Sequence, residues 1–432
     1  MNLHDLENSL IDDRFKSIPG GVEPFPLSRI AERGWNILRG DLPLPAAVLK
    51  QTAVAQNSRW MRRFLELTGA KICPHGKTTM APQLFRQQLD DGAWGITLAT
   101  AQQIQVARRF GVSRILLANQ LLSRPAIEYV VRELLRDSAF EFLCLVDSVA
   151  GVEMLAAEAQ RLGCSRPVEV LVEIGLPGKR CGCRDLEAAV AVARAVQQSS
   201  PFVQLRGVEG FEGVISSKQS AAAETQVREF VELLVRVARQ FDAEQLFAPG
   251  RIVLTAGGSA FYDLVIAGLG RAGLSRETDV IIRSGCYLTH DSLGCQKLFE
   301  QLLARSPQAR ELGAGLRPAL EVWSHVQSRP EPTRAILTMG KRDCSFDIEL
   351  PLPTHWFRHG THSRPEPIPL GHTIVSLNDQ HAWLDLPTDS PLAVGDLVAS
   401  GISHPCTTFD RWQLIPVVDD DYNVVAAVRT FF

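Results

Sequence analysis

The sequence predicts an α/β protein: a (β/α)8 TIM-type barrel followed by a mostly antiparallel β domain. Eight short apolar runs alternate with longer amphipathic segments between about residues 45 and 290. Most of these runs are apolar at consecutive positions, which is typical of parallel strands covered on both faces. Alternation repeated eight times favours a closed barrel over an open sheet. After about residue 315 the helical periodicity fades, and short strand-like runs are separated by Pro and Gly.

Each element follows from its local pattern. The expected barrel strands are 71–73, 95–98, 114–118, 142–146, 168–174, 205–208, 252–254 and 280–282. Helical spacing is clearest over 227–238, and a helix from about Pro45 to Leu67 is expected before the first strand. In the second part we expect strands at 319–323, 335–337, 373–375 and 424–428, with the Pro- and His-rich segment 351–370 as a loop. The predicted organisation is an N-terminal extension (1–44) lying against the β domain, the barrel (45–314) and the β domain (315–432).

Composition limits the class of function. The 432 residues exceed what one hydrophobic core usually supports, so two domains are expected. A net charge of −3 argues against a general nucleic-acid binder, and no apolar run is long enough to span a membrane. The start lacks the pattern of a secretory signal, and the nine cysteines follow no framework. We therefore expect a cytoplasmic protein with reduced thiols.

Polar residues that follow the strands gather at one rim of such a barrel, where active sites lie. The first strand is followed by Lys77 and the seventh by a Gly-Gly-Ser turn, which lets backbone N–H groups approach an anion. Each feature also has a plain structural explanation: Ser259 could be the N-cap of a helix, and a rim lysine is commonly a surface charge. Together, an amine and an anion-binding turn are what pyridoxal phosphate requires, because the cofactor carries an aldehyde and a phosphate.

Three ordered segments carry a family resemblance: 74–78 (Pro-His-Gly-Lys-Thr), 92–100 (Gly-Ala-Trp-Gly-Ile-Thr-Leu-Ala-Thr) and 115–119. They resemble the D-serine dehydratase and D-threonine aldolase family, which belongs to the alanine-racemase-like (fold type III) pyridoxal-phosphate enzymes. The likeness continues through 172–174, 180–182, 207–213, 257–259 and 284–287, and it covers about residues 42–415. The chain departs from the family at Phe211, where a tyrosine is frequent, and at Thr79, where a second lysine is common.

The resemblance implies roles for residues at the rim. Lys77 is expected to bond to the cofactor, and Arg180 is expected near the cofactor ring. The phosphate is expected on the turn formed by Gly257, Gly258 and Ser259, with Tyr287 as a further contact.

A second candidate site is His404-Pro405-Cys406 in the β domain. If these residues form a strand, His404 and Cys406 point to the same face and can share one zinc ion. Two buried strand residues without a metal are the alternative. Two ligands are too few for a closed structural site, so water or substrate would complete the coordination. In the family, D-serine dehydratases have His-x-Cys with zinc at this place, and D-threonine aldolases tend to have His-x-Asp. By the same resemblance His381 is a candidate catalytic residue near the metal, although an exposed loop histidine is an equal alternative.

The resemblance implies a pyridoxal-phosphate lyase that eliminates the β-hydroxyl of a D-amino acid, as in the conversion of D-serine to pyruvate and ammonia. Lys77 would act as the base and zinc as the Lewis acid. The main alternative is retro-aldol cleavage of D-threonine-like substrates, and a second is a non-catalytic pyridoxal-phosphate carrier. An alanine racemase is disfavoured because no tyrosine lies between residues 288 and 421. A homodimer with a small D-amino acid as its only expected partner completes the prediction.

Overall fold

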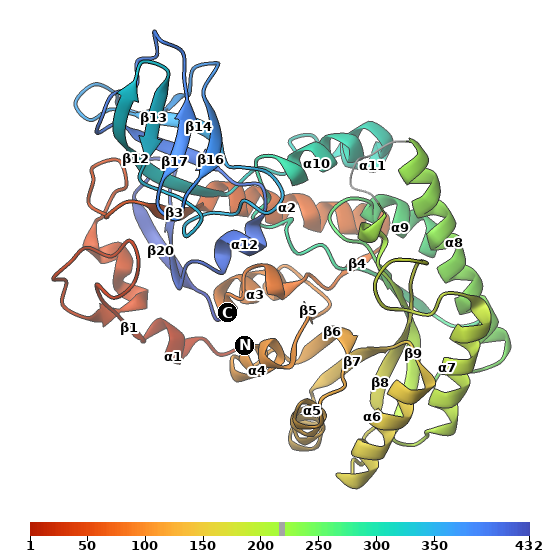
Figure 1. Ribbon diagram of the computed structural model, residues 1–432. Helices are drawn as coiled ribbons and strands as arrows, with labels where there is room; N and C mark the ends of the chain where they lie inside the picture. The colour runs from red at the N-terminus through yellow and green to blue at the C-terminus, as the bar shows by residue number, and fades with distance from the viewer. Residues whose placement is uncertain (216–220) are drawn as a thin grey trace.

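The computed structural model describes residues 1–215 and 221–432, and its larger part is a (β/α)8 barrel (Figure 1). Eight parallel strands follow the order β4-β11-β10-β9-β8-β7-β6-β5. The end strands are joined by backbone hydrogen bonds, from Trp94 to Ile72 (2.7 Å) and from Thr97 to Pro74 (2.9 Å), which close the barrel. The strands are β4 Lys71–Ile72, β5 Ile96–Leu98, β6 Arg114–Gln120, β7 Glu141–Val146, β8 Val168–Ile174, β9 Val203–Gly210, β10 Ile252–Ala256 and β11 Thr278–Ile282. The predicted fold class is confirmed, and a strand lies at each predicted position.

Helices cover the outside of the barrel. Their apolar faces pack on the strands, and several begin at a side-chain cap that accepts a backbone N–H, such as Thr100, Ser123, Ser148 and Asp185. The helices are α2 Gln51–Thr68, α3 Pro82–Asp90, α4 Ala101–Arg109, α5 Arg124–Arg136, α6 Val149–Arg161, α7 Leu186–Gln198, α8 Ala221–Ala243, α9 Tyr262–Leu269, α10 Gly294–Arg305 and α11 Pro307–Glu311. No helix of the described ranges is long and apolar enough to cross a membrane.

The second part is a mostly antiparallel sheet with the strand order β15-β14-β18-β12-β13-β17-β16, to which β3, β19 and β20 are joined. A short helix, α12 (Pro405–Phe409), follows β18 and packs on the turn that carries Lys77. Figure 1 shows α12 between this sheet and the barrel. The strands are β3 Ala46–Lys50, β12 Leu320–Glu331, β13 Arg334–Leu337, β14 Leu352–Phe357, β15 Glu366–Pro367, β16 Thr373–Leu377, β17 Ala382–Asp385, β18 Leu397–Gly401, β19 Leu414–Val418 and β20 Val424–Arg429.

Two sequence predictions about elements were wrong. The segment 351–370 is not wholly a loop, because β14 pairs with β18 and β15 pairs with β14. Pro353 lies at a register shift of that ladder, where a residue without an N–H is tolerated. The helix predicted from Pro45 begins later, at Gln51, because residues 46–50 form β3 and pair with β12. The apolar run Ala-Ala-Val-Leu suits a buried strand as well as a helix.

The N-terminal segment packs on the second sheet. It contains α1 His4–Glu7, β1 Leu10–Ile11, β2 Phe25–Pro26 and the 3-10 helix η1 Leu27–Arg33. Buried residues such as Ile30 and Phe25 share one hydrophobic cluster with Trp323 of β12. Figure 1 shows this segment beside β20, and η1 contacts β20. The three-part division of the chain stays a prediction. β3 precedes the first barrel strand in sequence, yet it pairs with β12 of the second sheet.

Candidate active site

Lys77 lies at the mouth of the barrel on the short helix η2 (Gly76–Thr78), which follows β4. Packing requires the glycine before it, since a Cβ on Gly76 would come within 2.9 Å of Ile96 and Phe85. The side chain of Lys77 is exposed, and within residues 1–215 and 221–432 it forms no hydrogen bond or ion pair. The amine therefore stands free at the end of the strands where barrel enzymes work.

Three cations gather at this mouth. The cations are Lys77, Arg283 and Arg180, and all three act on His75. Burial is the main reason that the pKa of the His75 imidazole lies well below its usual range, and the three positive charges lower it further. Charges act on a titrating group with this effect only at short range. The guanidinium of Arg180 lies 4.5 Å from the centre of the Phe211 ring, in a cation–π contact. The structure thus brings Lys77 and Arg180 to one rim, as predicted, and places Phe211 beneath the arginine.

The glycine turn after β10 binds an anion, and that anion belongs to the chain itself. The backbone N–H groups of Gly257 and Gly258 donate to the two carboxylate oxygens of Glu212, at 2.8 and 2.7 Å. Gly257 has φ +93°, a conformation that favours glycine, and a Cβ on Gly258 would lie 2.8 Å from the ring of Phe211. Two convergent N–H groups are an anion site. In this structure a carboxylate, rather than open space, faces them.

Ser259 and Tyr287 line one small cavity beside this turn. Helix α9 begins at Tyr262 with Phe261 at its N-cap, so Ser259 does not cap the helix. The hydroxyl of Tyr262 lines the same cavity and is buried with no hydrogen-bond partner among the described residues. The turn therefore has further hydroxyl donors close to it. The cofactor-binding roles of Gly257, Gly258, Ser259 and Tyr287 stay predictions.

His404 and Cys406 lie at the start of α12, and the prediction that they share the face of a strand was wrong. Strand β18 ends at Gly401, His404 is the N-cap residue, and Pro405 takes the first helical position. Proline is favoured there because the first turn of a helix leaves its N–H groups unpaired. The two side chains still interact: hydrogen bonding with Cys406, and then with Asp347, raises the pKa of His404 to about 9. The first turn of a helix, rather than one face of a strand, therefore carries both residues.

Asp347 fixes the ring of His404. Its Oδ2 lies 2.6 Å from His404 Nδ1, and its Oδ1 accepts a hydrogen bond from Thr407 Oγ1 at 2.7 Å. With Nδ1 engaged in this way, Nε2 is the nitrogen that remains for a metal. A carboxylate behind a histidine is the usual support for a metal-binding imidazole. The sequence carries no signal for this contact, because 57 residues separate Asp347 from His404.

One residue, Thr78, joins the two candidate sites. It follows Lys77 directly, and its Oγ1 lies 3.5 Å from the sulfur of Cys406 and 3.9 Å from the sulfur of Cys286. Cys286 stands in the turn after β11, and its neighbour Gly285 packs tightly on the Lys77 turn. The turn that carries Lys77 and the His-Cys pair therefore belong to one region of the molecule, although the sequence places them more than 320 residues apart.

His381 lies in the hairpin between β16 and β17. It is exposed, and its backbone carbonyl accepts the N–H of Asn378 at 2.8 Å. Within the described ranges its side chain forms no hydrogen bond or ion pair. The catalytic role predicted for His381 stays a prediction.

A buried ion pair was missed by the sequence reasoning. Arg283 bonds to Glu209 and donates to Thr255 Oγ1 at 2.8 Å and to the carbonyl of Gly210 at 3.0 Å. Burial raises the pKa of Glu209 to about 7, while the arginine opposes the shift. The pair connects the carboxyl ends of β9, β10 and β11 below the rim of the barrel.

The described residues contain one group of three potential ligands whose ligand atoms all lie within 4.8 Å of one another, namely Asp147, Glu173 and Cys181. Other contacts engage these residues, since Gly182 N donates to Asp147 at 2.9 Å and Gln120 donates to Glu173 at 2.5 Å. His404 and Cys406 have no third ligand at such short range in this structure.

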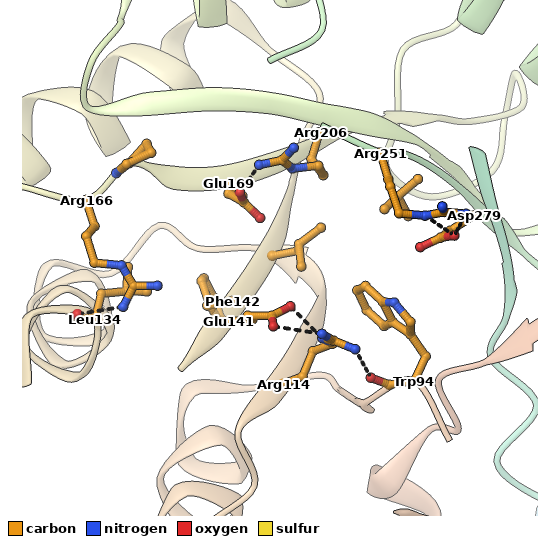
Figure 2. Close-up of a pocket in the computed structure, with 13 residues that line it drawn as sticks. Trp94, Arg114, Leu134, Glu141, Phe142, Arg166, Glu169, Arg206, Arg251 and Asp279 are labelled. Carbon is orange, nitrogen blue, oxygen red and sulfur yellow. Dashed lines mark hydrogen bonds and ion pairs between the residues drawn. The ribbon is translucent and has the colours of Figure 1, made fainter. Parts of the chain in front are cut away.

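A larger pocket of about 290 Å³ opens at the opposite end of the barrel. Figure 2 shows its walls, where arginines and carboxylates at the beginnings of the strands pair with one another, such as Arg114 with Glu141 and Arg251 with Asp279. Residues at this end of a barrel serve stability, and reactive groups gather at the other end. We therefore assign this pocket no role in the chemistry.

The donors at the mouth fit pyridoxal phosphate and a divalent metal. Among the described residues the Lys77 amine and the Tyr262 hydroxyl have no hydrogen-bond partner, and the N–H groups of the Gly257–Gly258 turn already bind a carboxylate. An imidazole and a thiol are the ligands that zinc prefers. One condition follows for the phosphate: Glu212 has to share the glycine turn or leave it.

Comparison with known proteins gives relatives along most of the chain. The 3-hydroxy-D-aspartate aldolase of Paracoccus denitrificans (strain Pd 1222) is 24% identical over 323 residues, which are 72% of this chain and 75% of that protein. The D-threonine aldolase of an Arthrobacter species is 22% identical over 391 residues, which are 90% of this chain and 92% of that protein. The match to the D-threo-3-hydroxyaspartate dehydratase of Delftia sp. (strain HT23) is 27% identical over 169 residues, 39% of this chain and 43% of that protein.

Solved structures share the fold. The D-threonine aldolase from Filomicrobium marinum superposes with a TM-score of 0.73 at 18% identity, covering 90% of this chain and 95% of that chain. The D-threo-3-hydroxyaspartate dehydratase from Delftia sp. HT23 gives 0.70 at 20% identity, covering 92% and 99%. Residues 319–418 match the family described as "Putative serine dehydratase domain". Residues 49–264, half of the chain, match the family "Alanine racemase, N-terminal domain", and this chain belongs to that family.

Proposed function

We propose that this protein is a pyridoxal-phosphate-dependent lyase that removes the β-hydroxyl of a small D-amino acid and releases ammonia and a keto acid, as D-serine dehydratases do. One observation carries the proposal. Thr78, the neighbour of Lys77, lies against Cys406 of the His-x-Cys pair. This contact supports a reaction in which Lys77 removes the α-proton while a metal on His404 and Cys406 assists the β-hydroxyl. A homodimer, a cytoplasmic location and zinc as the metal stay predictions from the sequence.

The chain's own residues divide the work. Pyridoxal phosphate, when bound, supplies the electron sink for charge that develops at the α-carbon. Lys77 Nζ takes the α-proton, since it is an unpaired amine at the barrel mouth. His404 and Cys406 would hold the divalent metal, whose chemistry is that of a Lewis acid toward the β-hydroxyl. Asp347 keeps the His404 ring oriented, and Arg180 on Phe211 adds positive charge at the rim.

The relatives support the metal assignment. Solved structures of D-threo-3-hydroxyaspartate dehydratase include a histidine-to-alanine variant and a cysteine-to-alanine variant, at positions two residues apart. The cysteine variant is described as metal-free. His404 and Cys406 of this chain have the same spacing.

Retro-aldol cleavage is the second candidate, because the aldolases of Paracoccus and Arthrobacter match this chain over most of its length. In that reaction the bond between the α- and β-carbons breaks, and the base acts on the hydroxyl proton. Incubation of the cofactor- and zinc-loaded protein with D-serine and with D-threonine separates the two. Pyruvate from D-serine supports elimination. Acetaldehyde and glycine from D-threonine, without pyruvate from D-serine, would contradict elimination and support retro-aldol cleavage.

The role of Lys77 is tested by Lys77→Ala. We expect the variant to lose the visible absorbance of the bound cofactor and at least about 1,000-fold of the turnover, because both the attachment point and the base are removed. The matched control is Lys179→Ala, an exposed lysine on the loop after β8, which should keep both. An unchanged spectrum of Lys77→Ala would remove this lysine from the mechanism.

A further inference from the structure

We propose that Cys286 is a third protein ligand of the metal held by His404 and Cys406. This inference rests on the metal site of the proposed function and deepens it. The site would then have one imidazole and two thiolates from the protein, with a fourth position open to substrate. Three protein ligands and an open position are typical of a catalytic zinc site.

The distance between the two sulfurs suits a shared ion. Cys286 Sγ lies 4.0 Å from Cys406 Sγ. Two thiolates on one tetrahedral zinc, with bonds of about 2.3 Å, lie about 3.8 Å apart. The sulfurs therefore need to move by only a few tenths of an ångström. Among the described residues, the ligand atoms of His404, Cys286 and Cys406 do not all lie within 4.8 Å of one another, so His404 has to turn toward the sulfurs.

The backbone holds Cys286 in this place. A Cβ on the preceding Gly285 would lie 2.4 Å from the carbonyl oxygen of His75 and 2.7 Å from Thr78 Oγ1, so the turn is pressed against the Lys77 turn. The carbonyl of Cys286 accepts the N–H of His290 at 2.7 Å. Because contacts on both sides fix this turn, the Cys286 thiol is held close to Cys406.

The opposite ligand, Cys406, is equally constrained. It lies in the first turn of α12, and this helix packs on η2. Its sulfur also hydrogen-bonds to Thr78 Oγ1 at 3.5 Å. The His404 side chain remains 28% exposed, so the site is accessible from solvent on this side. A metal here would connect the barrel to the second sheet.

A second thiol nearby provides a matched control. Cys295, near the start of α10, lines the same small cavity as Cys286, and its backbone N–H donates to Asp291 Oδ1 at 2.9 Å. Of these two thiols, only Cys286 lies within hydrogen-bonding distance of Cys406 among the described residues. We therefore assign Cys286 to the metal and leave Cys295 outside the coordination.

The test counts sulfur ligands directly. X-ray absorption of the zinc-loaded full-length protein should show two sulfurs for the wild type and for Cys295→Ser, and one sulfur for Cys286→Ser. Cobalt substitution gives a second readout, since the thiolate-to-cobalt absorbance should fall by about half in Cys286→Ser. Competition with a chelator should show zinc bound more than about 10-fold more weakly by Cys286→Ser than by Cys295→Ser, because the loss of a ligand exceeds the loss of an outer contact.

The outcomes separate this inference from the function on which it rests. One sulfur in the wild type, or equal sulfur counts for the wild type and Cys286→Ser, would overturn the role of Cys286. If the wild type shows three sulfur ligands and Cys295→Ser shows two, Cys295 is a fourth protein ligand. The site would then have no position open to substrate, and the inference would be wrong. His404→Ala and Cys406→Ser report on the proposed function itself. If both retain zinc as tightly as the wild type, the metal site of the proposed function fails, whatever Cys286 does.

Discussion

At the scale of single residues, His75 sets a pH limit on stability. Its ring Nδ1 is buried without a hydrogen-bond partner among the described residues, and burial beside Lys77 and Arg283 holds its pKa well below the usual range. The unfolded chain takes up a proton at about pH 6.5, whereas the folded chain does not, so stability falls as the pH drops below that value. From pH 8 to pH 5 we expect His75 to cost about 2 kcal/mol.

Comparison of the wild type with His75→Gln isolates this effect. Denaturant titration at pH 8 and pH 5 measures the free energy of unfolding of both proteins. Between these pH values the wild type should lose about 2 kcal/mol more stability than the variant. His4→Gln, at an exposed histidine, should show no such shift. An identical pH dependence for wild type and His75→Gln would mean that the ring takes up its proton in the folded state.

Glu212 is the residue that most directly tests how the glycine turn is used. Its carboxylate accepts both turn N–H groups, and charge-assisted hydrogen bonds of this kind contribute about 1.5–3 kcal/mol each. We expect Glu212→Gln to destabilise the cofactor-free protein by about 2 kcal/mol. If the phosphate uses the same N–H groups, removal of the negative charge should also lower the Kd for pyridoxal phosphate several-fold. A higher Kd would show that Glu212 supports cofactor binding instead of competing with it.

At the scale of elements, the local pattern was enough to predict the barrel strands but not the structure around His404 and Cys406. Each barrel strand is a continuous apolar run bounded by polar residues, so its position is readable without tertiary context. β14 was missed because Pro353 and the surrounding prolines mask a strand that tolerates them at a register shift. The pattern His404-Pro405-Cys406 predicts a strand because a proline favours an extended backbone at the residue before it. A proline is also favoured at the first position of a helix, which is where Pro405 lies.

The site shows the same division. Lys77 and the glycine turn follow strand ends, so the barrel itself predicts that they share a rim. Glu212 on the turn, Asp347 behind His404 and the Cys286–Cys406 contact are long-range side-chain contacts with no local signature. Local sequence patterns therefore predict which residues lie at the rim, but not the long-range contacts that hold them there.

The contact between the 284–286 turn and η2 gives a prediction at this scale. Gly285→Ala places a methyl group 2.4 Å from the carbonyl oxygen of His75, so one of the two turns has to move. We expect a loss of about 1–3 kcal/mol in stability and a larger, at least 10-fold, weakening of pyridoxal phosphate binding, because Lys77 lies on the displaced turn. Gly20→Ala, with nothing within 4 Å of the new methyl group, is the control. Normal cofactor affinity in Gly285→Ala would show that the turns are not coupled.

At the scale of the whole molecule, the chain crosses between its two parts more than once. β3 precedes the barrel in sequence but pairs with β12 and β19 of the second sheet. Lys50, at the end of β3, forms an ion pair of 2.6 Å with Glu321 of β12. α12 returns from the sheet to the barrel mouth. The His-Cys pair is therefore positioned by the sheet and the amine by the barrel, and the site depends on how the two are joined.

The N-terminal segment completes the core of the sheet, and this predicts that it unfolds together with it. Ile30 is 1% exposed in the cluster that contains Trp323, whereas Leu10 of the same segment is 58% exposed. Ile30→Ala should lower the free energy of unfolding by about 2–5 kcal/mol, since it removes buried methyl groups and leaves a cavity, and Leu10→Ala should change it by less than about 0.5 kcal/mol. Denaturant unfolding followed by tryptophan fluorescence measures both. If the segment detached before the sheet unfolded, Ile30→Ala would leave the main transition in place, and the extension would be an accessory rather than part of the core.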